Sequence, residues 1–359
     1  MRKIYLIRHG EPDFPGGRSM CLGATDLPLS SLGRMRAAMT GAYLEDADIS
    51  AVFSSDLSRA VETAQAIGGS VECDPGFREA YFGEWEGLPF DEIRRLYRGL
   101  YEKRGAHPGI LPPGGEHYDE CASRFSQSLK NALKSAAGNI VVVSHSAVIK
   151  AFLGELLGME PDEFMSLSLP CGSVTVLDED GGELAVHSIG ARPLPALRDG
   201  LCRTFWDCVQ LPDNIRAHCG AVSELAGELC SRLNFAGLSL DAAVVRASSL
   251  LHDIARASPH HADAGGSMVA ALGYPAHGEI IRRHMELPDF DGRIDEAAVV
   301  YIADKLTMGS QRATLEARFA HSLRKCITKE ALCAHEARLD RAREVGRAIN
   351  RICGKELVI

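Results

Sequence analysis

The stretch Ile4-Tyr5-Leu6-Ile7-Arg8-His9-Gly10-Glu11 decides the fold of the first half of this chain. Its apolar start predicts a short strand buried on both faces, where no polar alternation is needed. An imidazole and a guanidinium follow directly at the strand end, and Gly10 then lets another group approach closely. An uncharged imidazole is a good nucleophile, and a guanidinium grips phosphate oxygens in a bidentate fork. The stretch therefore predicts a site that attacks phosphate at the end of a buried strand.

Composition describes an ordinary folded protein. The chain has 359 residues, of which 46% are hydrophobic and 24% charged, and this length predicts two domains or three. A net charge of −9 argues against nucleic acid as a partner. The longest apolar stretch, 139–159, is interrupted by His145, Lys150 and Glu155, so we expect no membrane span.

The cysteines and the N-terminus indicate the compartment. The 11 cysteines are scattered without any C-x-x-C pair, which argues against a disulfide framework and against a zinc ribbon. The N-terminus reaches Arg8 too early for a signal peptide. We therefore expect a cytoplasmic protein with reduced, mostly buried thiols.

Strand-like and helix-like segments alternate in the first half of the chain. This alternation predicts an α/β domain of three layers, with a doubly wound parallel sheet and a hairpin at its end. The uniformly apolar run 140–143 suits a central strand. We expect strands at 4–7, 51–53, 140–143, 174–177 and 184–189, and helices at 32–44, 58–67 and 148–157.

The pattern changes after two prolines in 192–195. Amphipathic helical patterns follow, and no strand pattern stands out, so the second half is expected to be all-α. We expect a first domain at 1–192, a linker at 193–211, and a second domain at 212–359 that ends in a helical extension. Its helices are expected at 217–233, 240–257, 279–285, 296–308 and 330–353.

Three strand ends of the first domain carry the residues suited to phosphate chemistry. Arg8 and His9 follow the first strand, Arg59 lies shortly after the second, and His145 follows the strand 140–143. Ligands of doubly wound sheets bind outside the carboxyl ends of the strands. A single histidine after a strand is more often structural, so the repetition of position is what predicts a shared site.

These residues lie in blocks that resemble a known family. The blocks are 6–11, 23–30, 54–64, 77–87 and 143–145. They occur in the order typical of the histidine phosphatase superfamily, also called phosphoglycerate mutase-like, and together they cover about half of the chain. The segment 79–87 looks most like the small phosphomonoesterases that include α-ribazole phosphatase, and less like the glycolytic mutases.

The resemblance implies a role for each residue. His9 becomes phosphohistidine, while Arg8, Arg59 and His145 bind the phosphoryl oxygens. Glu79 gives a proton to the leaving oxygen and then takes one from water. A carboxyl group beside a phosphate is pushed towards its protonated form, which suits a general acid. The arginines and His145 supply positive charge, so no metal is expected in this domain.

Ser146 departs from the family pattern, because many relatives have glycine after the second histidine. Its hydroxyl is expected to contact the phosphate and to alter substrate fit, so we count Ser146 among the substrate-binding residues. The substrate itself is expected to be a small phosphorylated compound. The segments 12–22 and 94–117 are expected to carry its specificity.

The second domain holds a separate cluster around His252 and Asp253. The apolar flanks 250–251 and Ile254 place this pair in a buried setting, where an uncompensated carboxylate is costly. Metal binding removes that cost, and imidazole and carboxylate ligands suit Fe, Mn, Zn or Mg. A His-Asp pair alone is a weak signal and is more often a surface pair.

The wider spacing resembles the HD metal-dependent phosphohydrolase superfamily over 212–310, most closely its symmetrical diadenosine-tetraphosphate hydrolases. This resemblance implies one or two divalent ions held by His218, His252, Asp253, His261, His284 and Asp304. If all six bind, the site is dinuclear, and if His261 or His284 points away it is mononuclear. His260 and His277 are expected to be bystanders.

The two clusters together predict a bifunctional phosphohydrolase. Its first domain is a metal-independent phosphomonoesterase, and its second acts on a nucleotide or dinucleotide polyphosphate. The alternative is a phosphoglycerate mutase-type phosphoryl transferase with an HD module that only senses nucleotides or oligomerises. The arginine-rich helix 330–353 is expected to be solvated or to face a second copy in a homodimer, and an acidic partner is the less favoured alternative.

Overall fold

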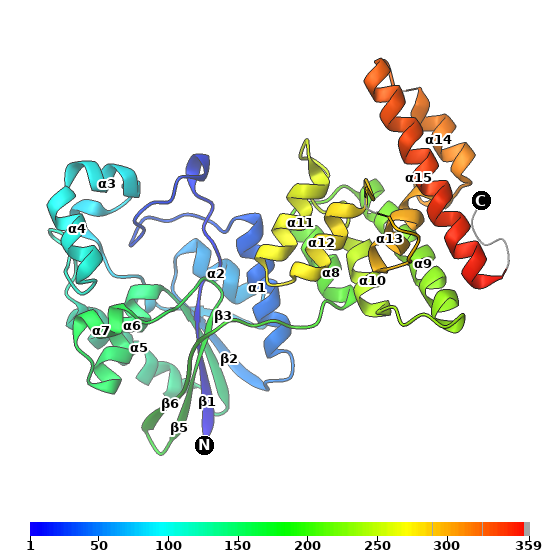
Figure 1. Cartoon of the computed structure of the whole chain (residues 1–359). Coiled ribbons are helices and arrows are strands. Elements are labelled where there is room, and N and C mark those ends of the chain that lie inside the picture. Colours follow the sequence, from blue (N-terminus) through cyan, green and yellow to red (C-terminus); the bar gives the residue numbers. More distant parts are fainter. Residues whose placement is uncertain (289, 325, 355–359) are drawn as a thin grey trace. The chain divides into compact units, whose positions relative to one another are not determined.

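A computed structural model describes residues 1–288, 290–324 and 326–354 (Figure 1). The chain separates into two compact units, Met1–Pro195 and Ala196–Ile359. A sheet with helices on both faces forms the first unit, and helices form almost all of the second. Among the residues that the structure describes, no helix combines the length and the apolar character needed to span a bilayer.

The first unit is built on one mixed sheet in the order β3-β2-β4-β1-β5-β6. Strands β1 to β4 run parallel to one another. In the expected terminal hairpin, β5 pairs antiparallel with β1, and β6 pairs antiparallel with β5. The apolar strand β4 lies between β2 and β1, as its sequence predicts. The strands are β1 (Arg2–Arg8), β2 (Ile49–Ser54), β3 (Val71–Cys73), β4 (Asn139–Ser144), β5 (Val174–Asp180) and β6 (Glu183–Ala191).

Alternate side chains of the strands fill two cores and so produce three layers. Tyr5 and Ile7 pack with Ala60 of α2 on one face of the sheet. Ile4 and Leu6 pack on the other face with side chains of α5 and α6. The layers therefore follow from the side-chain period of two in a strand covered on both faces. The helices are α1 (Ser31–Leu44), α2 (Ser58–Gln65), α3 (Phe90–Leu96), α4 (Arg98–Ala106), α5 (Tyr118–Ser135), α6 (Ser146–Leu157) and α7 (Pro161–Met165).

The second unit packs its helices around α13, which is buried from Ala297 to Lys305. The sequence did not predict α11 (His261–Ala271) or α14 (Leu315–Leu323), and the helix expected at 240–257 ends at Leu251. Two further differences concern the expected linker and the end of α13. The expected linker 193–211 contains a helix, α8, because Phe205 and Trp206 on its inner face are buried. The helices are α8 (Asp199–Cys208), α9 (Asp213–Phe235), α10 (Ala242–Leu251), α11 (His261–Ala271), α12 (Pro275–Arg283), α13 (Glu296–Lys305), α14 (Leu315–Leu323) and α15 (Lys329–Cys353).

The second difference concerns the end of α13. The helix expected at 296–308 ends at Lys305, because β7 (Thr307–Met308) pairs with β8 (Gln311–Arg312). The turn between them contains Gly309 with φ of 61°, a conformation that favours glycine. The second unit is therefore not free of strands, although this hairpin is short.

Two glycines bring the loop after β1 against the first turn of α1. A Cβ atom on Gly10 would lie 2.3 Å from the carbonyl oxygen of Gly33. A Cβ atom on Gly33 would lie 2.1 Å from the carbonyl oxygen of Glu11. The close approach that Gly10 predicts is thus an approach of backbone to backbone, and it fixes the segment that follows His9.

Replacement of Gly33 tests this packing. Gly33→Ala should lower the free energy of unfolding by about 1–3 kcal/mol, because backbone has to move to admit the methyl group. Gly99→Ala is the control, since a Cβ at Gly99 in α4 meets nothing within 4 Å. That variant should be neutral or gain up to about 1 kcal/mol from helix propensity. Urea denaturation followed by circular dichroism measures both, and equal effects would contradict the packing argument.

Candidate active site and candidate metal centre

The carboxyl ends of neighbouring parallel strands bring two histidines together in the first unit. His9 follows β1 and His145 follows β4, and their rings meet edge to face with centroids 4.9 Å apart. Both side chains are buried. Ser55 follows β2 at the same edge, so three strands contribute to one site.

The hydrogen bonds of His9 fix which of its two ring nitrogens is protonated. Its Nδ1 lies 2.6 Å from the carbonyl oxygen of Gly10, and a carbonyl can only accept, so Nδ1 carries the proton. Nε2 is then unprotonated, with Nε of Arg59 at 3.3 Å. Burial lowers the pKa of His9 well below its ordinary value, and the charges of Arg59 and Arg8 lower it further. The imidazole is therefore neutral at neutral pH and presents a nucleophilic lone pair.

His145 has one ring nitrogen that lacks a hydrogen-bond partner among the described residues. Its Nε2 lies 2.8 Å from Oγ of Ser55, while its buried Nδ1 has no hydrogen-bond partner among the described residues. Burial lowers the pKa of His145 well below its ordinary value, with further contributions from His9 and Arg59. A buried polar atom without a partner is costly unless a ligand satisfies it.

Arg59 is fully buried and is positioned by the loop that contains Gly23 and Thr25. The sequence did not predict this contact. Nη1 and Nη2 of Arg59 donate to the carbonyl oxygens of Thr25 and Gly23 at 2.8 and 2.9 Å. The carboxylate of Glu86 in turn accepts from the N–H groups of Gly23 and Thr25 at 3.0 and 2.8 Å. Glu86 therefore orders the loop that aims Arg59 at His9. It lies within the family-like block 77–87, but its sequence position alone does not reveal this contact.

The remaining expected residues surround the same sheet edge. Glu79 is buried, and its carboxylate accepts from the N–H groups of Ala147 and Val148 at 3.2 and 3.0 Å, in the first turn of α6. Ser146 is the first residue of α6 and is half-buried. Arg8 is also half-buried, and its Nε has no partner among the described residues. Free N–H groups at a helix start thus orient Glu79 beside the two histidines.

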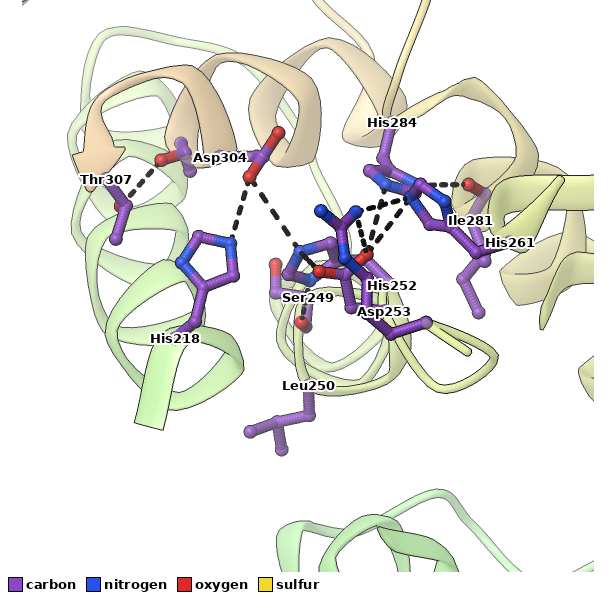
Figure 2. A network of polar contacts seen from close by, with 12 residues as sticks. His218, Ser249, Leu250, His252, Asp253, His261, Ile281, His284, Asp304 and Thr307 are labelled. Atoms are coloured by element: carbon purple, nitrogen blue, oxygen red, sulfur yellow. Dashed lines mark hydrogen bonds and ion pairs between the residues drawn. The ribbon is translucent and has the colours of Figure 1, made fainter. Parts of the chain in front are cut away.

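The second unit gathers a different set of side chains, shown in Figure 2. Three imidazoles donate Nδ1–H to a backbone carbonyl. Figure 2 shows the bonds from His252 to Ser249 and from His284 to Ile281, each 2.7 Å long. His218 donates in the same way to Gly309 at 2.8 Å. Nδ1 of each ring is thereby occupied, and Nε2 is the nitrogen that faces the cluster. Such backbone partners fix the ring orientation of histidines that bind metals.

The Nε2 atoms meet two carboxylates. Oδ1 of Asp304 lies 3.1 Å from His218 Nε2 and 3.8 Å from His252 Nε2. Oδ1 of Asp253 lies 3.2 Å from His261 Nε2 and 3.6 Å from His284 Nε2, while its Oδ2 lies 3.8 Å from His252 Nε2. All six expected residues therefore converge. Within the described residues, two groups of three potential ligands share Asp253, namely His218, His252 and Asp253, and Asp253, His261 and His284, while Asp304 joins the cluster through His218 without belonging to either group.

The electrostatics of this cluster fit a divalent cation. Burial raises the pKa of Asp253, but hydrogen bonds from His261 and His284 outweigh burial and hold the pKa below its ordinary value. Burial lowers the pKa of His252 to about 4, so its ring is neutral. Its buried Nε2 has no hydrogen-bond partner among the described residues. Burial lowers the pKa of His218, but its hydrogen bond to Asp304 outweighs burial and raises that pKa above its ordinary value. Carboxylates and imidazoles together form a donor set that suits Fe, Mn and Zn.

Two neighbouring groups complete the description of the cluster. The guanidinium of Arg256 lies 3.0 Å from His261 Nε2, so a metal bound through His261 would displace it. The Arg256 side chain is 46% exposed and is free to move outward. His260 and His277, expected to be bystanders, have no place in either ligand group.

Buried imidazoles and a buried guanidinium lie at the strand ends of the first unit. This arrangement is suited to a phosphatase. The comparisons with known proteins agree. Residues 4–192 match the profile of the histidine phosphatase superfamily (branch 1), and the chain belongs to that superfamily. Residues 215–309 match the HD domain, a class of domain that is generally metal-dependent.

Two curated relatives each match less than half of the chain. The uncharacterized phosphatase PhoE of Bacillus subtilis is 31% identical over 168 residues, which are 45% of this chain and 81% of PhoE. The glucosyl-3-phosphoglycerate phosphatase of Mycolicibacterium vanbaalenii is 31% identical over 176 residues, 46% of this chain and 78% of its own. Among solved structures, Bacillus stearothermophilus YhfR is 29% identical, covers 53% of this chain and 97% of its own, and has a TM-score of 0.49. The chain is thus a phosphatase of this superfamily that also carries an HD domain.

The buried histidines predict a pH dependence of stability. The unfolded chain protonates His9 and His145 near pH 6.5, whereas the folded protein resists protonation until the pH is well below this value. The unfolded state then binds more protons, so the free energy of unfolding falls as pH drops below about 6.5.

Each histidine should contribute up to about 1.4 kcal/mol per pH unit to that slope. Urea denaturation between pH 7 and pH 5 measures it, and His9→Gln and His145→Gln should each flatten the slope by about that amount. A slope that both variants leave unchanged would mean that neither imidazole is held neutral in the folded state.

Proposed function

We propose that the domain 1–192 is a metal-independent phosphomonoesterase that works through phosphohistidine at His9. The observation that supports this proposal is the unprotonated Nε2 of His9, which accepts a hydrogen bond from Nε of Arg59 at 3.3 Å. The unpartnered Nδ1 of His145 and Nε of Arg8 supply further positions for phosphoryl oxygens. Phosphoryl transfer needs positioning and charge neutralisation above all, and these residues provide both.

The reaction follows from these positions. Nε2 of His9 attacks phosphorus, the bond from phosphorus to the leaving oxygen breaks, and Glu79 gives that oxygen a proton. Glu79 then removes a proton from water, whose oxygen attacks phosphorus and releases His9 and inorganic phosphate. Ser146, at the start of α6, lies next to His145 and contributes to binding of the phosphate. The substrate is a small phosphomonoester, which accords with the phosphatase names of two relatives.

The domain 212–359 acts, in this proposal, as a metal-dependent phosphohydrolase on a nucleotide or dinucleotide polyphosphate. Its six converging side chains would hold two divalent ions, drawn from Fe, Mn, Zn or Mg. Divalent ions held there would supply a water polarised for attack on phosphorus. Asp253 suits a bridging role, because its two oxygens lie near different histidines. The 11 cysteines are free thiols, which supports a cytoplasmic location.

Metal content tests the dinuclear arrangement. Protein loaded with Mn²⁺ and then desalted should retain about two ions per chain by elemental analysis, and His261→Ala about one. His260→Ala is the matched control and should retain the wild-type content, because His260 lies outside both ligand groups. One ion in the wild type would contradict the bridging role of Asp253.

Chelation separates the two proposed activities. A panel of phosphomonoesters and nucleotide polyphosphates is assayed with and without EDTA for the wild type, His9→Ala and Asp253→Ala. His9→Ala should lower the EDTA-resistant monoesterase activity by about 1,000-fold or more, because it removes the nucleophile. Asp253→Ala should abolish only the EDTA-sensitive activity. Monoesterase activity that survives His9→Ala would defeat the phosphohistidine mechanism.

The same assays distinguish the alternative functions. A phosphoryl transferase would leave the phosphate esterified on the product, whereas the proposed phosphatase releases it as inorganic phosphate. An HD domain that only senses nucleotides would hold metal but show no EDTA-sensitive hydrolysis of any nucleotide in the panel.

A further inference from the structure

Lys305, the residue after the proposed ligand Asp304, is buried at the end of α13. Lysine is almost never fully buried unless its charge is paired. Nζ of Lys305 lies 2.7 Å from Oδ2 of Asp304 and donates to the carbonyl oxygen of His284 at 3.0 Å. It also lies 4.9 Å from the centroid of the Tyr301 ring.

These contacts join two elements that carry proposed ligands. Asp304 belongs to α13, and His284 caps the C-terminus of α12. Since Lys305 occupies Oδ2 of Asp304, it is Oδ1 that lies 3.1 Å from Nε2 of His218. The ammonium group thereby sets which oxygen of Asp304 faces the imidazoles.

We propose that Lys305 is a positioning residue of the metal centre, which directs Oδ1 of Asp304 towards a divalent cation and neutralises the second oxygen. This inference rests on the metal centre proposed above. Lys305 differs from Arg256, which also lies near a proposed ligand. The Arg256 side chain is 46% exposed and is free to leave, whereas the Lys305 side chain is 7% exposed and is enclosed.

The charge balance gives the proposal a distinctive consequence. Without Lys305, the buried carboxylate of Asp304 loses its permanently charged partner when the protein is metal-free and keeps only His218, whose imidazole is charged only when protonated. Loss of one partner from a buried ion pair is strongly destabilising. A bound divalent cation restores a counter-charge at the same carboxylate. Loss of Lys305 should therefore harm the metal-free protein more than the metal-loaded protein. If Lys305 only linked α13 to α12, its loss would destabilise the metal-free and the metal-loaded protein equally.

Thermal unfolding of the full chain, with and without metal, measures this difference. The background is Trp85→Phe, so that Trp206 is the one tryptophan left and its fluorescence reports the second unit. In EDTA, Lys305→Met should lower the melting temperature by about 10 °C. In saturating Mn²⁺ the decrease should be less than half as large. The variant loaded with Co²⁺ should also show altered visible absorption, because Asp304 is then free to present both oxygens.

Two further variants serve as controls. Tyr301→Phe removes the hydroxyl that donates to the carbonyl oxygen of Arg338 at 3.1 Å but keeps the ring beside Lys305. Its decrease in melting temperature should be the same in EDTA and in Mn²⁺. Lys305→Arg keeps the charge, and Mn²⁺ should raise its melting temperature as much as that of the wild type.

Equal decreases for Lys305→Met in EDTA and in Mn²⁺ would overturn the positioning role, and so would failure of this variant to fold in both. A different outcome would overturn the metal centre itself. In that case the wild type would retain no Mn²⁺ after desalting, and its melting temperature would not respond to Mn²⁺.

Discussion

One interaction underlies both sites, the hydrogen bond from Nδ1–H of an imidazole to a backbone carbonyl. Gly10 accepts it from His9 in the first unit, and Ser249 and Ile281 accept it from His252 and His284 in the second. Because the carbonyl can only accept, Nδ1 carries a proton and Nε2 is the nitrogen that faces the site. Backbone that helices and strands already hold in place thus determines the chemistry of each ring.

The surroundings of the rings decide what each site attracts. Cationic Arg8 and Arg59 raise the cost of protonating His9 and draw an anion to it. Anionic Asp253 and Asp304 lie against the imidazoles of the second unit and draw a cation instead. An imidazole fixed in the same way is therefore the proposed nucleophile for phosphorus in one unit and a proposed metal ligand in the other.

Much of this arrangement could be predicted from the sequence, because it follows from local patterns. The placement of His9 and His145 at one sheet edge comes from the parallel order of their strands. The resemblance to the HD superfamily implies His261 rather than His260 as a ligand, and His261 is the one that lies against Asp253. Contacts between distant segments could not be predicted. Glu86 accepts a hydrogen bond from the N–H group of Gly23, and Lys305 donates one to the carbonyl oxygen of His284. Neither contact leaves a local pattern in the sequence.

The errors at element ends have the same origin. The apolar pattern of α13 continues into Leu306 and Met308, and only the pairing of β7 with β8 ends the helix at Lys305. The prolines near 195 predict a linker, although residues 199–208 form α8 and bury one face of it. Tertiary contacts decided both cases against the local pattern.

The central claim is that Nε2 of His9 accepts the phosphoryl group. In the most direct measurement, the protein is treated with EDTA and mixed rapidly with a phosphomonoester that it hydrolyses. The reaction is quenched in base, and the phosphoryl group is located by mass spectrometry. The account predicts an acid-labile phosphoryl group on His9 that disappears as substrate is exhausted. Continued hydrolysis with no phosphoryl group on His9 would contradict it.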